Sequence, residues 1–430
     1  MMADRRRRAL MWAVGAGAAG AGAFALRPAD AGAPHDGYFR ALSGAIADAG
    51  IAVPTMVIDR ERMLANARTI LRNIGGRMGL RLVAKSLPSL PLLDELMSAM
   101  TTRRLMVFNL PYLQLIAESR PDTDLLLGKP LPVAAAAQFY EGFKGGGFRP
   151  ERQLQWLVDT PERLAQYRDL ARGRRIELRI NLEIDVGLHR GGVDSVQTML
   201  RMIDIFVSEP RLVWSGLMGY DAHVAKLPDI PGVRDGALAE SKRRYAEYAA
   251  LARDASRRGA ATREPAFNTG GSPTYRLHDG GGAANELAIG SALVKPSDFD
   301  TELLQDLAPA AFIATPVLKA GREFLLPNGV EGLGRALTAW NVNQRRAYFI
   351  YGGNWLADPV SPAGLAASGL YGTSSNQQVL VGSGGQGLRP DDFVFLRPRQ
   401  SEAVLQQFGD IALLEGGRIA QRWPVLPAMP

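Results

Sequence analysis

The sequence has no cysteine and only four histidines in 430 residues. Disulfides and thiolate metal sites are therefore excluded, although a cysteine-free chain is compatible with both the cytoplasm and the periplasm. After residue 31, no apolar run approaches the roughly 20 residues that a membrane-spanning helix needs. With 47% hydrophobic and 22% charged residues, the composition is that of a globular protein and excludes collagen-like and low-complexity chains.

The chain also lacks a strong excess of one charge. Its 50 basic and 43 acidic side chains give a net charge of +7, of which residues 1–31 contribute three. The remainder of about +4 is too small to indicate a nucleic-acid partner. Single hydrophobic cores stop growing at roughly 250–300 residues, so the length allows two domains or a barrel-sized domain with an attachment.

Residues 1–31 have the organisation of an export signal. Arg5–Arg8 precede an apolar run over residues 9–26, and Ala29-Asp30-Ala31 is similar to a cleavage site. The arginine pair directly before the run resembles a twin-arginine signal, which predicts a periplasmic protein. Two alternatives stay open: an inner-membrane anchor through residues 9–26 that faces the periplasm, and a basic tail without a targeting role.

Strand-like and helix-like segments alternate after residue 50. The predicted strands are Val53–Ile58, Arg81–Ala84, Leu105–Phe108, Asp124–Leu127, Gln155–Val158, Ile176–Ile184, Leu212–Met218 and Ala266–Asn268. The predicted helices include Arg60–Ile74, Leu90–Met100, Val193–Val207 and Ala237–Arg257. About eight such units favour an α/β fold with a (β/α)8 barrel over residues 32–300. A doubly wound open sheet is the alternative, because periodicity alone does not separate the two.

The last third of the chain has a different pattern, in which short strand-like runs are separated by Gly, Pro and Asn turns. These runs are Ala311–Leu318, Ala347–Tyr351, Gln378–Val381, Phe393–Leu396 and Ile411–Leu414. We therefore expect residues 301–430 to form a smaller, mostly β domain.

Polar segments follow four of the predicted strands. Lys85 ends one strand, where its amine could form a Schiff base. Arg190 and Tyr220 follow two later strands, and the Arg190 guanidinium could bind an oxyanion. Thr269–Thr274, with two consecutive glycines, could bind a phosphate through backbone N–H groups. Each segment alone has an ordinary structural explanation, but together they predict one site at the mouth of a barrel.

In this order, the segments resemble those of the fold-type III pyridoxal-phosphate enzymes. The nearest subgroup is D-threonine aldolase and D-serine dehydratase, which share the alanine-racemase barrel. The resemblance covers about residues 50–425 and is strongest at Pro54–Asp59, Ala84-Lys85, Glu183–Gly192, Gly219–His223 and Thr269–Thr274. It implies pyridoxal 5′-phosphate as cofactor, a small amino acid as substrate, and a homodimer.

The resemblance also implies roles for individual residues. Lys85 would form the internal aldimine and carry the proton at the substrate α-carbon. Arg190 would lie near the ring oxygen, and Tyr220 would lie beside the cofactor as the second catalytic residue. The phosphate would be held by Thr269, Gly270, Gly271 and Ser272.

The sequence departs from the subgroup at the expected metal site. Where the family has a His and, two residues on, a Cys or Asp, this chain has Gln400 and Glu402. Asn376–Gln378 also stands where the family carries acidic residues. An amide oxygen is a poor replacement for imidazole, although a glutamate could hold Mg²⁺ weakly. We therefore expect no metal ligands in this segment.

The expected function is a lyase that acts on D-β-hydroxy amino acids through Lys85, by carbon–carbon or carbon–oxygen cleavage. One alternative is an amino-acid racemase, which needs a base on the opposite face. Tyr348, Tyr351 and Tyr371 are the possible bases. The other alternative is a protein that binds the cofactor without catalysis.

Overall fold

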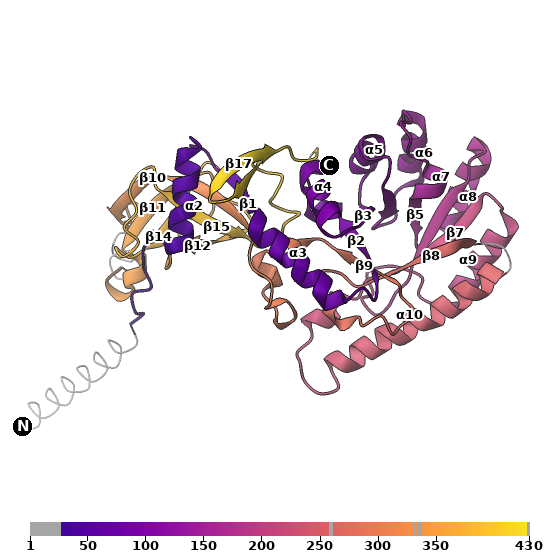
Figure 1. Cartoon of the computed structure of the whole chain (residues 1–430). Helices are drawn as coiled ribbons and strands as arrows, with labels where there is room; N and C mark the ends of the chain where they lie inside the picture. The colour runs from indigo at the N-terminus through magenta and orange to yellow at the C-terminus, as the bar shows by residue number, and fades with distance from the viewer. Residues whose placement is uncertain (1–26, 258–260, 330–331, 333–337, 428–430) are drawn as a thin grey trace, which may run out of the picture. The chain divides into compact units, whose positions relative to one another are not determined.

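The computed structural model describes residues 27–257, 261–329, 332 and 338–427 (Figure 1). Residues 1–26 of the expected export signal lie outside these ranges, so periplasmic export stays a prediction. Within the described ranges, every helix is too short or too polar to cross a bilayer.

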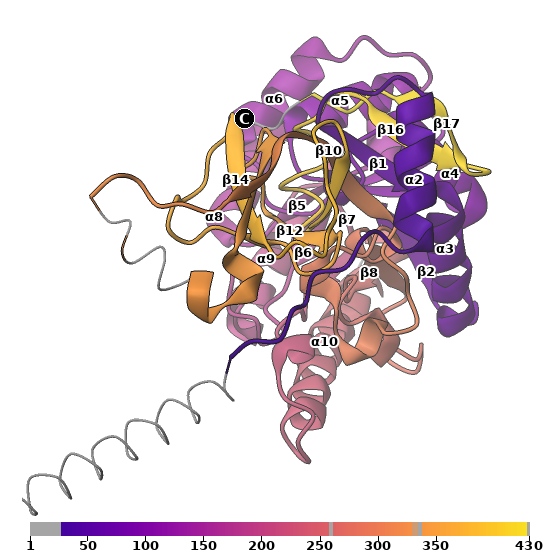
Figure 2. The ribbon, with the colours of Figure 1, turned by 90° about the vertical axis from the view of Figure 1, so that its left-hand side faces the viewer.

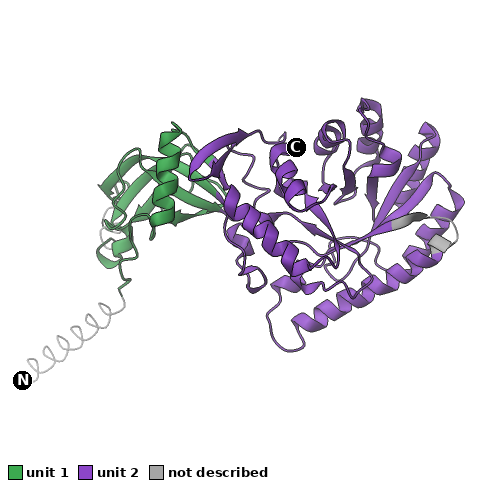
Figure 3. Cartoon of the chain, in the orientation of Figure 1, with its two compact units in different colours: residues 1–55, 312–397 green, residues 56–311, 398–430 purple. Residues whose placement is uncertain are grey.

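The chain divides into two compact units (Figure 3). The first, here called the β unit, comprises residues 312–397 and the described part of residues 1–55. The second, here called the barrel unit, comprises residues 56–311 and 398–430.

The barrel unit contains a closed barrel of eight parallel strands, β2 to β9. They are β2 (Gly79–Val83), β3 (Arg104–Val107), β4 (Asp124–Leu127), β5 (Leu154–Val158), β6 (Leu178–Glu183), β7 (Leu212–Gly219), β8 (Ala261–Thr269) and β9 (Glu286–Ile289). Parallel pairing of β9 with β2 closes the ring. The predicted α/β fold with a (β/α)8 barrel is confirmed, and the doubly wound sheet is excluded.

Helices surround these strands, as Figure 2 shows for the barrel unit. They are α3 (Arg60–Ile74), α4 (Leu90–Ala99), α5 (Leu110–Ser119), α6 (Val133–Gly142), α7 (Pro150–Gln153), α8 (Pro161–Arg174), α9 (Val196–Ser208) and α10 (Arg234–Arg257). Local sequence explains several boundaries. For example, the Asp59 carboxylate caps α3 by accepting the N–H of Arg62, and Gly75 ends the helix in the left-handed region at φ 61°.

The strand that opens the predicted alternation is not a barrel strand. β1 (Thr55–Asp59) pairs in parallel with β16 (Ile411–Glu415), and β16 pairs antiparallel with β17 (Arg418–Trp423). The eighth barrel strand is instead β9, which the sequence analysis did not predict. Its four residues lie between glycine-containing turns, so the run is too short for a clear periodicity.

The β unit contains an antiparallel sheet, and the predicted mostly β character is confirmed. Its strands are β10 (Ala311–Glu323), β11 (Arg346–Tyr351), β12 (Ala357–Ser361), β13 (Ala366–Ala367), β14 (Gln377–Gly382) and β15 (Phe393–Pro398). β11 pairs with both β10 and β14, and β15 also pairs with β10.

The unit boundaries differ from the expected ones of 32–300 and 301–430 at both ends. The N-terminal helix α2 (Gly37–Asp48) belongs to the β unit because the Phe39 ring packs against Phe312 and Phe395. Residues 398–430 belong to the barrel unit because β16 pairs with β1. Helix α2 and strand β16 thus each pack with residues that are distant in the sequence.

Candidate active site

A cavity of about 210 Å³ opens at the carboxyl ends of the barrel strands. Six of the seven residues predicted for the site line it: Lys85, Arg190, Tyr220, Gly270, Gly271 and Ser272. The seventh, Thr269, ends β8 outside this cavity, and its hydroxyl donates to the Gly219 carbonyl at 3.2 Å. Because the lining residues follow different parallel strands, the barrel topology itself brings them together.

Lys85 lies in a short 3-10 turn, Ala84–Ser86, directly after β2. Its Nζ atom is 3.5 Å from Glu402 Oε1, and it lies 4.7 Å from the centre of the Phe108 ring. One third of the Lys85 side chain is exposed, so the amine is accessible from the cavity. An accessible amine with a counter-ion at the strand end is suited to covalent chemistry with a carbonyl compound.

Glu402 holds the centre of a small polar cluster beside Lys85. Its Oε2 atom accepts hydroxyl hydrogen bonds from Ser401 at 3.1 Å and from Ser291 at 3.3 Å. Burial by itself raises the pKa of Glu402. Lys85 and hydrogen bonds to the carboxylate outweigh that effect, and the pKa stays below its ordinary value. The carboxylate is therefore ionised at neutral pH.

The residues at the expected metal-site segment have other partners. Gln400 Nε2 donates to Asp298 Oδ2 at 3.1 Å, and Arg399 forms an ion pair with the same carboxylate at 3.2 Å. Glu402 is paired with Lys85. In the described ranges, no group of three or more His, Asp or Glu side chains is arranged to hold a metal ion. An amide and a lysine-paired carboxylate do not fit the ligand set of a divalent transition metal.

Arg190 and Tyr220 form a second contact at the cavity. The Arg190 guanidinium lies over the Tyr220 ring, 5.2 Å from its centre. Burial raises the pKa of the Tyr220 hydroxyl, and Arg190 partly opposes this rise. A cation–π interaction thus joins the Arg190 guanidinium and the Tyr220 ring at the mouth of the barrel.

The glycine loop after β8 presents bare backbone to the cavity. Gly270 has φ +64°, and a Cβ atom on Gly271 would lie only 2.6 Å from Tyr220 Cε2. The Ser272 hydroxyl accepts N–H bonds from Gly290 at 3.0 Å and Ala292 at 3.1 Å, which joins this loop to the turn after β9. A glycine loop with backbone N–H groups at a strand end fits a bound phosphate.

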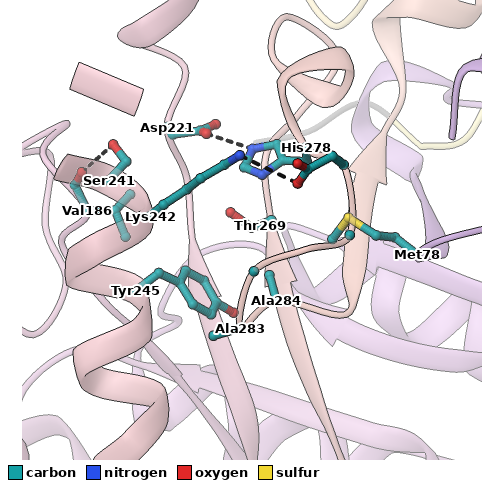
Figure 4. Close-up of a pocket in the computed structure, with 13 residues that line it drawn as sticks. Met78, Val186, Asp221, Ser241, Lys242, Tyr245, Thr269, His278, Ala283 and Ala284 are labelled. Atoms are coloured by element: carbon teal, nitrogen blue, oxygen red, sulfur yellow. Dashed lines mark hydrogen bonds and ion pairs between the residues drawn. The ribbon is translucent and has the colours of Figure 1, made fainter. Parts of the chain in front are cut away.

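Asp221 is connected to this loop through hydrogen bonds. Its Oδ1 atom accepts the Thr274 hydroxyl at 2.6 Å, and its Oδ2 atom contacts His278 Nε2 at 2.8 Å. The Thr274 oxygen in turn accepts the N–H of Gly271 at 3.2 Å. Figure 4 shows Asp221 and His278 turned toward each other at a second, smaller pocket, which Thr269 also lines. Asp221 therefore acts on the glycine loop without lining the larger cavity.

The lining residues that sequence reasoning missed include Phe108 and Ser291. It also missed the pairing of Glu402 with Lys85. Ser291 follows β9, so a correct prediction of that strand would have found it. Glu402 belongs to the segment where the resemblance implies a metal site, so the sequence analysis does not connect it with Lys85.

The three tyrosines considered as racemase bases all lie in the β unit. The Tyr348 hydroxyl donates to the Ser383 carbonyl at 3.0 Å, and the Tyr371 hydroxyl donates to the Leu325 carbonyl at 2.7 Å. Tyr351 is 40% exposed. The residues that line the larger cavity all belong to the barrel unit.

Solved structures with the same fold include three enzymes. D-threonine aldolase from Filomicrobium marinum has a TM-score of 0.69 at 15% identity, over 93% of this chain and 98% of that one. D-threo-3-hydroxyaspartate dehydratase from Delftia sp. HT23 has a TM-score of 0.66 at 17% identity, over 87% and 98%. Alanine racemase from Bacillus anthracis has a TM-score of 0.62 at 13% identity, also over 87% and 98%. At these identities the likeness shows the fold alone.

No curated protein sequence matches the chain. Residues 58–298, more than half of the chain, match the family described as alanine racemase, N-terminal domain. This match and the closed eight-stranded barrel agree with the resemblance found in the sequence. The chain therefore belongs to the alanine racemase N-terminal domain family, within the fold-type III pyridoxal-phosphate enzymes.

Proposed function

We propose that this protein is a pyridoxal-phosphate-dependent lyase that acts on D-β-hydroxy amino acids, with Lys85 as the residue that bonds the cofactor. The observation that carries the proposal is a single cavity that contains the Lys85 amine, the Arg190 guanidinium and the glycine loop at Gly270-Gly271. The aldolase and the dehydratase among the structural neighbours support the substrate class.

The lining residues fit the parts of the cofactor. The backbone of Gly270, Gly271 and Ser272 would hold the phosphate, and Arg190 would bind the ring oxygen by a charge-assisted hydrogen bond. When bound, pyridoxal phosphate supplies an aldehyde for the lysine and a conjugated ring that delocalises negative charge from the substrate α-carbon. Lys85 would then hold or release the proton at that carbon.

Amino-acid racemisation is the second candidate, because alanine racemases are among the structural neighbours. Racemisation requires a base on each side of the α-carbon. A lyase of this class instead needs a group that acts on the β-hydroxyl. Incubation with D-threonine, D-serine and L-alanine separates the reactions through their products: aldehyde, keto acid or the opposite enantiomer. Cofactor uptake without any of these products would favour a non-catalytic binding protein.

The cofactor site is tested by covalent trapping. Protein reconstituted with pyridoxal phosphate and reduced with borohydride should carry one adduct, which peptide mass spectrometry locates on Lys85. Lys85→Ala should abolish both the adduct and turnover, because it removes the amine. Lys242→Ala is a matched control. The Lys242 side chain is 36% exposed and its Nζ atom lies 3.6 Å from the Asp279 carboxylate. The Lys85 side chain is 33% exposed and its Nζ atom lies 3.5 Å from the Glu402 carboxylate. An adduct at another lysine, or none, would contradict the proposal.

A further inference from the structure

Glu402 is the acidic side chain that lines the cavity, and the sequence resemblance would assign a metal ligand to its position. In this chain, the carboxylate is instead held by Lys85 on one oxygen and by hydroxyl groups on the other. The Oε1 atom lies 3.5 Å from Lys85 Nζ, and the Oε2 atom accepts from Ser401 and Ser291. The Ser86 hydroxyl lies 3.5 Å from the same Oε2. The arrangement therefore places a fixed anion beside the lysine.

We propose that Glu402 is the general base that removes the β-hydroxyl proton of the substrate, so that this protein cleaves the Cα–Cβ bond and does not eliminate the hydroxyl group. The inference rests on the proposed function and narrows it to aldol cleavage.

The chemistry of the two reactions explains the choice. Elimination of water needs an acid or a metal ion at the β-hydroxyl, because hydroxide is a poor leaving group. Cleavage needs the opposite, a base that takes the hydroxyl proton while the Cα–Cβ bond breaks. An ionised carboxylate held by a lysine and by serine hydroxyls can accept a proton and has none to donate.

The proposed step is balanced without a further reactant. The β-hydroxyl proton moves to Glu402, the oxygen electrons form the carbonyl bond of an aldehyde, and the electron pair of the Cα–Cβ bond remains at Cα. Lys85 then gives a proton to Cα, which yields glycine, and the proton on Glu402 passes to Lys85 directly or through solvent. D-threonine would give acetaldehyde and glycine.

The same carboxylate should select among substrates. The charged side chains that line the cavity are Lys85, Arg190 and Glu402. Arg190 would be engaged by the cofactor and Lys85 would serve the α-carbon, which leaves Glu402 as the charged lining group available to the substrate side chain. A second carboxylate on the substrate would be repelled there, because like charges interact strongly in a partly desolvated site. We therefore expect neutral substrates such as D-threonine to be accepted and D-3-hydroxyaspartate to be rejected.

The first test compares wild-type holoenzyme with Glu402→Gln and Glu402→Asp. Aldehyde formation from D-threonine should fall about 100-fold in Glu402→Gln, within the usual range for loss of a general base, and should be partly retained in Glu402→Asp. Glu247→Gln is the control, because Glu247 lies on α10 with 46% of its side chain exposed and forms an ion pair with Arg243. Wild-type rates in Glu402→Gln, or keto acid and ammonia as the main wild-type products, would overturn the inference.

Two further measurements separate a base from a structural residue. Exchange of the glycine Cα hydrogen with D₂O, followed by NMR, should stay within about threefold in Glu402→Gln, since it needs only a proton carrier at Cα. Binding of D-aspartate, followed through the cofactor absorbance, should tighten about tenfold in Glu402→Gln because the repulsion is removed. Loss of glycine exchange in the variant, or unchanged D-aspartate affinity, would contradict the role assigned to Glu402.

Failure of the proposed function would look different. If wild-type protein shows no adduct at Lys85 and no glycine exchange, the cofactor site itself is wrong. If wild-type protein does both but forms no aldehyde from D-threonine, D-serine or D-3-hydroxyaspartate, the cofactor site stands and the role of Glu402 is refuted.

Discussion

Glu183 illustrates how the barrel mouth changes the behaviour of a single residue. It ends β6, where burial and the nearby Asp159 carboxylate raise its pKa from the ordinary 4.5 to about 7, against the opposing effect of Arg190. A carboxyl group with a raised pKa binds its proton more tightly in the folded state than in the unfolded state. Its contribution to stability is therefore present at low pH and is lost as the pH rises from about 4.5 to about 7.

Replacing this carboxyl group should remove the pH-dependent loss. Glu183→Gln should match wild type near pH 4 and become more stable toward pH 8, by on the order of 1–3 kcal/mol. Urea unfolding at a series of pH values measures the difference, with Glu247→Gln as a control for the same substitution at an exposed site. A Glu183→Gln curve parallel to wild type would show that the Glu183 pKa is not raised.

At the scale of elements, the turns that follow β7 and β8 depend on one buried carboxylate. Asp221 comes from the first turn, while Thr274 and His278, which it contacts, come from the second. Since Thr274 also accepts the Gly271 N–H, the position of the glycine loop is coupled to Asp221. Asp221, at the smaller pocket in Figure 4, thus helps to fix the glycine loop that lines the larger cavity.

Removal of this carboxylate should affect both stability and the glycine loop. Asp221→Ala leaves two buried polar groups without their partner, so the free energy of unfolding should fall by about 2–4 kcal/mol. Affinity for pyridoxal phosphate should fall as well, because the Gly271 N–H loses its fixed orientation. Chemical denaturation and cofactor titration measure the two effects. Asp279→Ala is the control, since Asp279 lines the same pocket with a side chain that is 73% exposed, and equal effects in both variants would refute the coupling.

At the scale of the whole molecule, the resemblance to the fold-type III enzymes predicts a homodimer. The β unit exposes large apolar side chains that a partner could cover, among them Leu318, Leu325 and Leu370, at 41%, 59% and 52% exposure. Light scattering at micromolar concentration should give twice the mass of one chain, which is 46.4 kDa for all 430 residues. If the export signal is cleaved, the mass of each chain is lower by the mass of that segment. A monomer under these conditions would contradict the prediction. Export through residues 1–31 is a separate prediction that cell fractionation can test.

The sequence by itself determined seven of the eight barrel strands and which strand ends carry most residues of the candidate site. Lys85, Tyr220 and the glycine loop each follow a strand whose apolar pattern is local, and a residue that follows a parallel strand lies at the barrel mouth whatever the rest of the chain does. The helix Arg60–Ile74 was predicted with its observed bounds because its cap, its apolar face and its terminal glycine are all written in neighbouring residues. β9 was missed because four residues carry too little periodic information.

The tertiary structure alone decided the role of the chain's C-terminal segment. The Ser86 hydroxyl contacts the Glu402 carboxylate although the two residues are 316 positions apart in the sequence. They meet because residues 398–430 belong to the barrel unit, where β16 pairs with β1. No local pattern encodes such a contact, since it depends on which strands pair over a long separation. In the sequence, Glu402 could be compared only with the metal-ligand position that the family resemblance implies. In the folded chain, its distance to Lys85 makes it a counter-ion at the site, and that distance is a property of the topology.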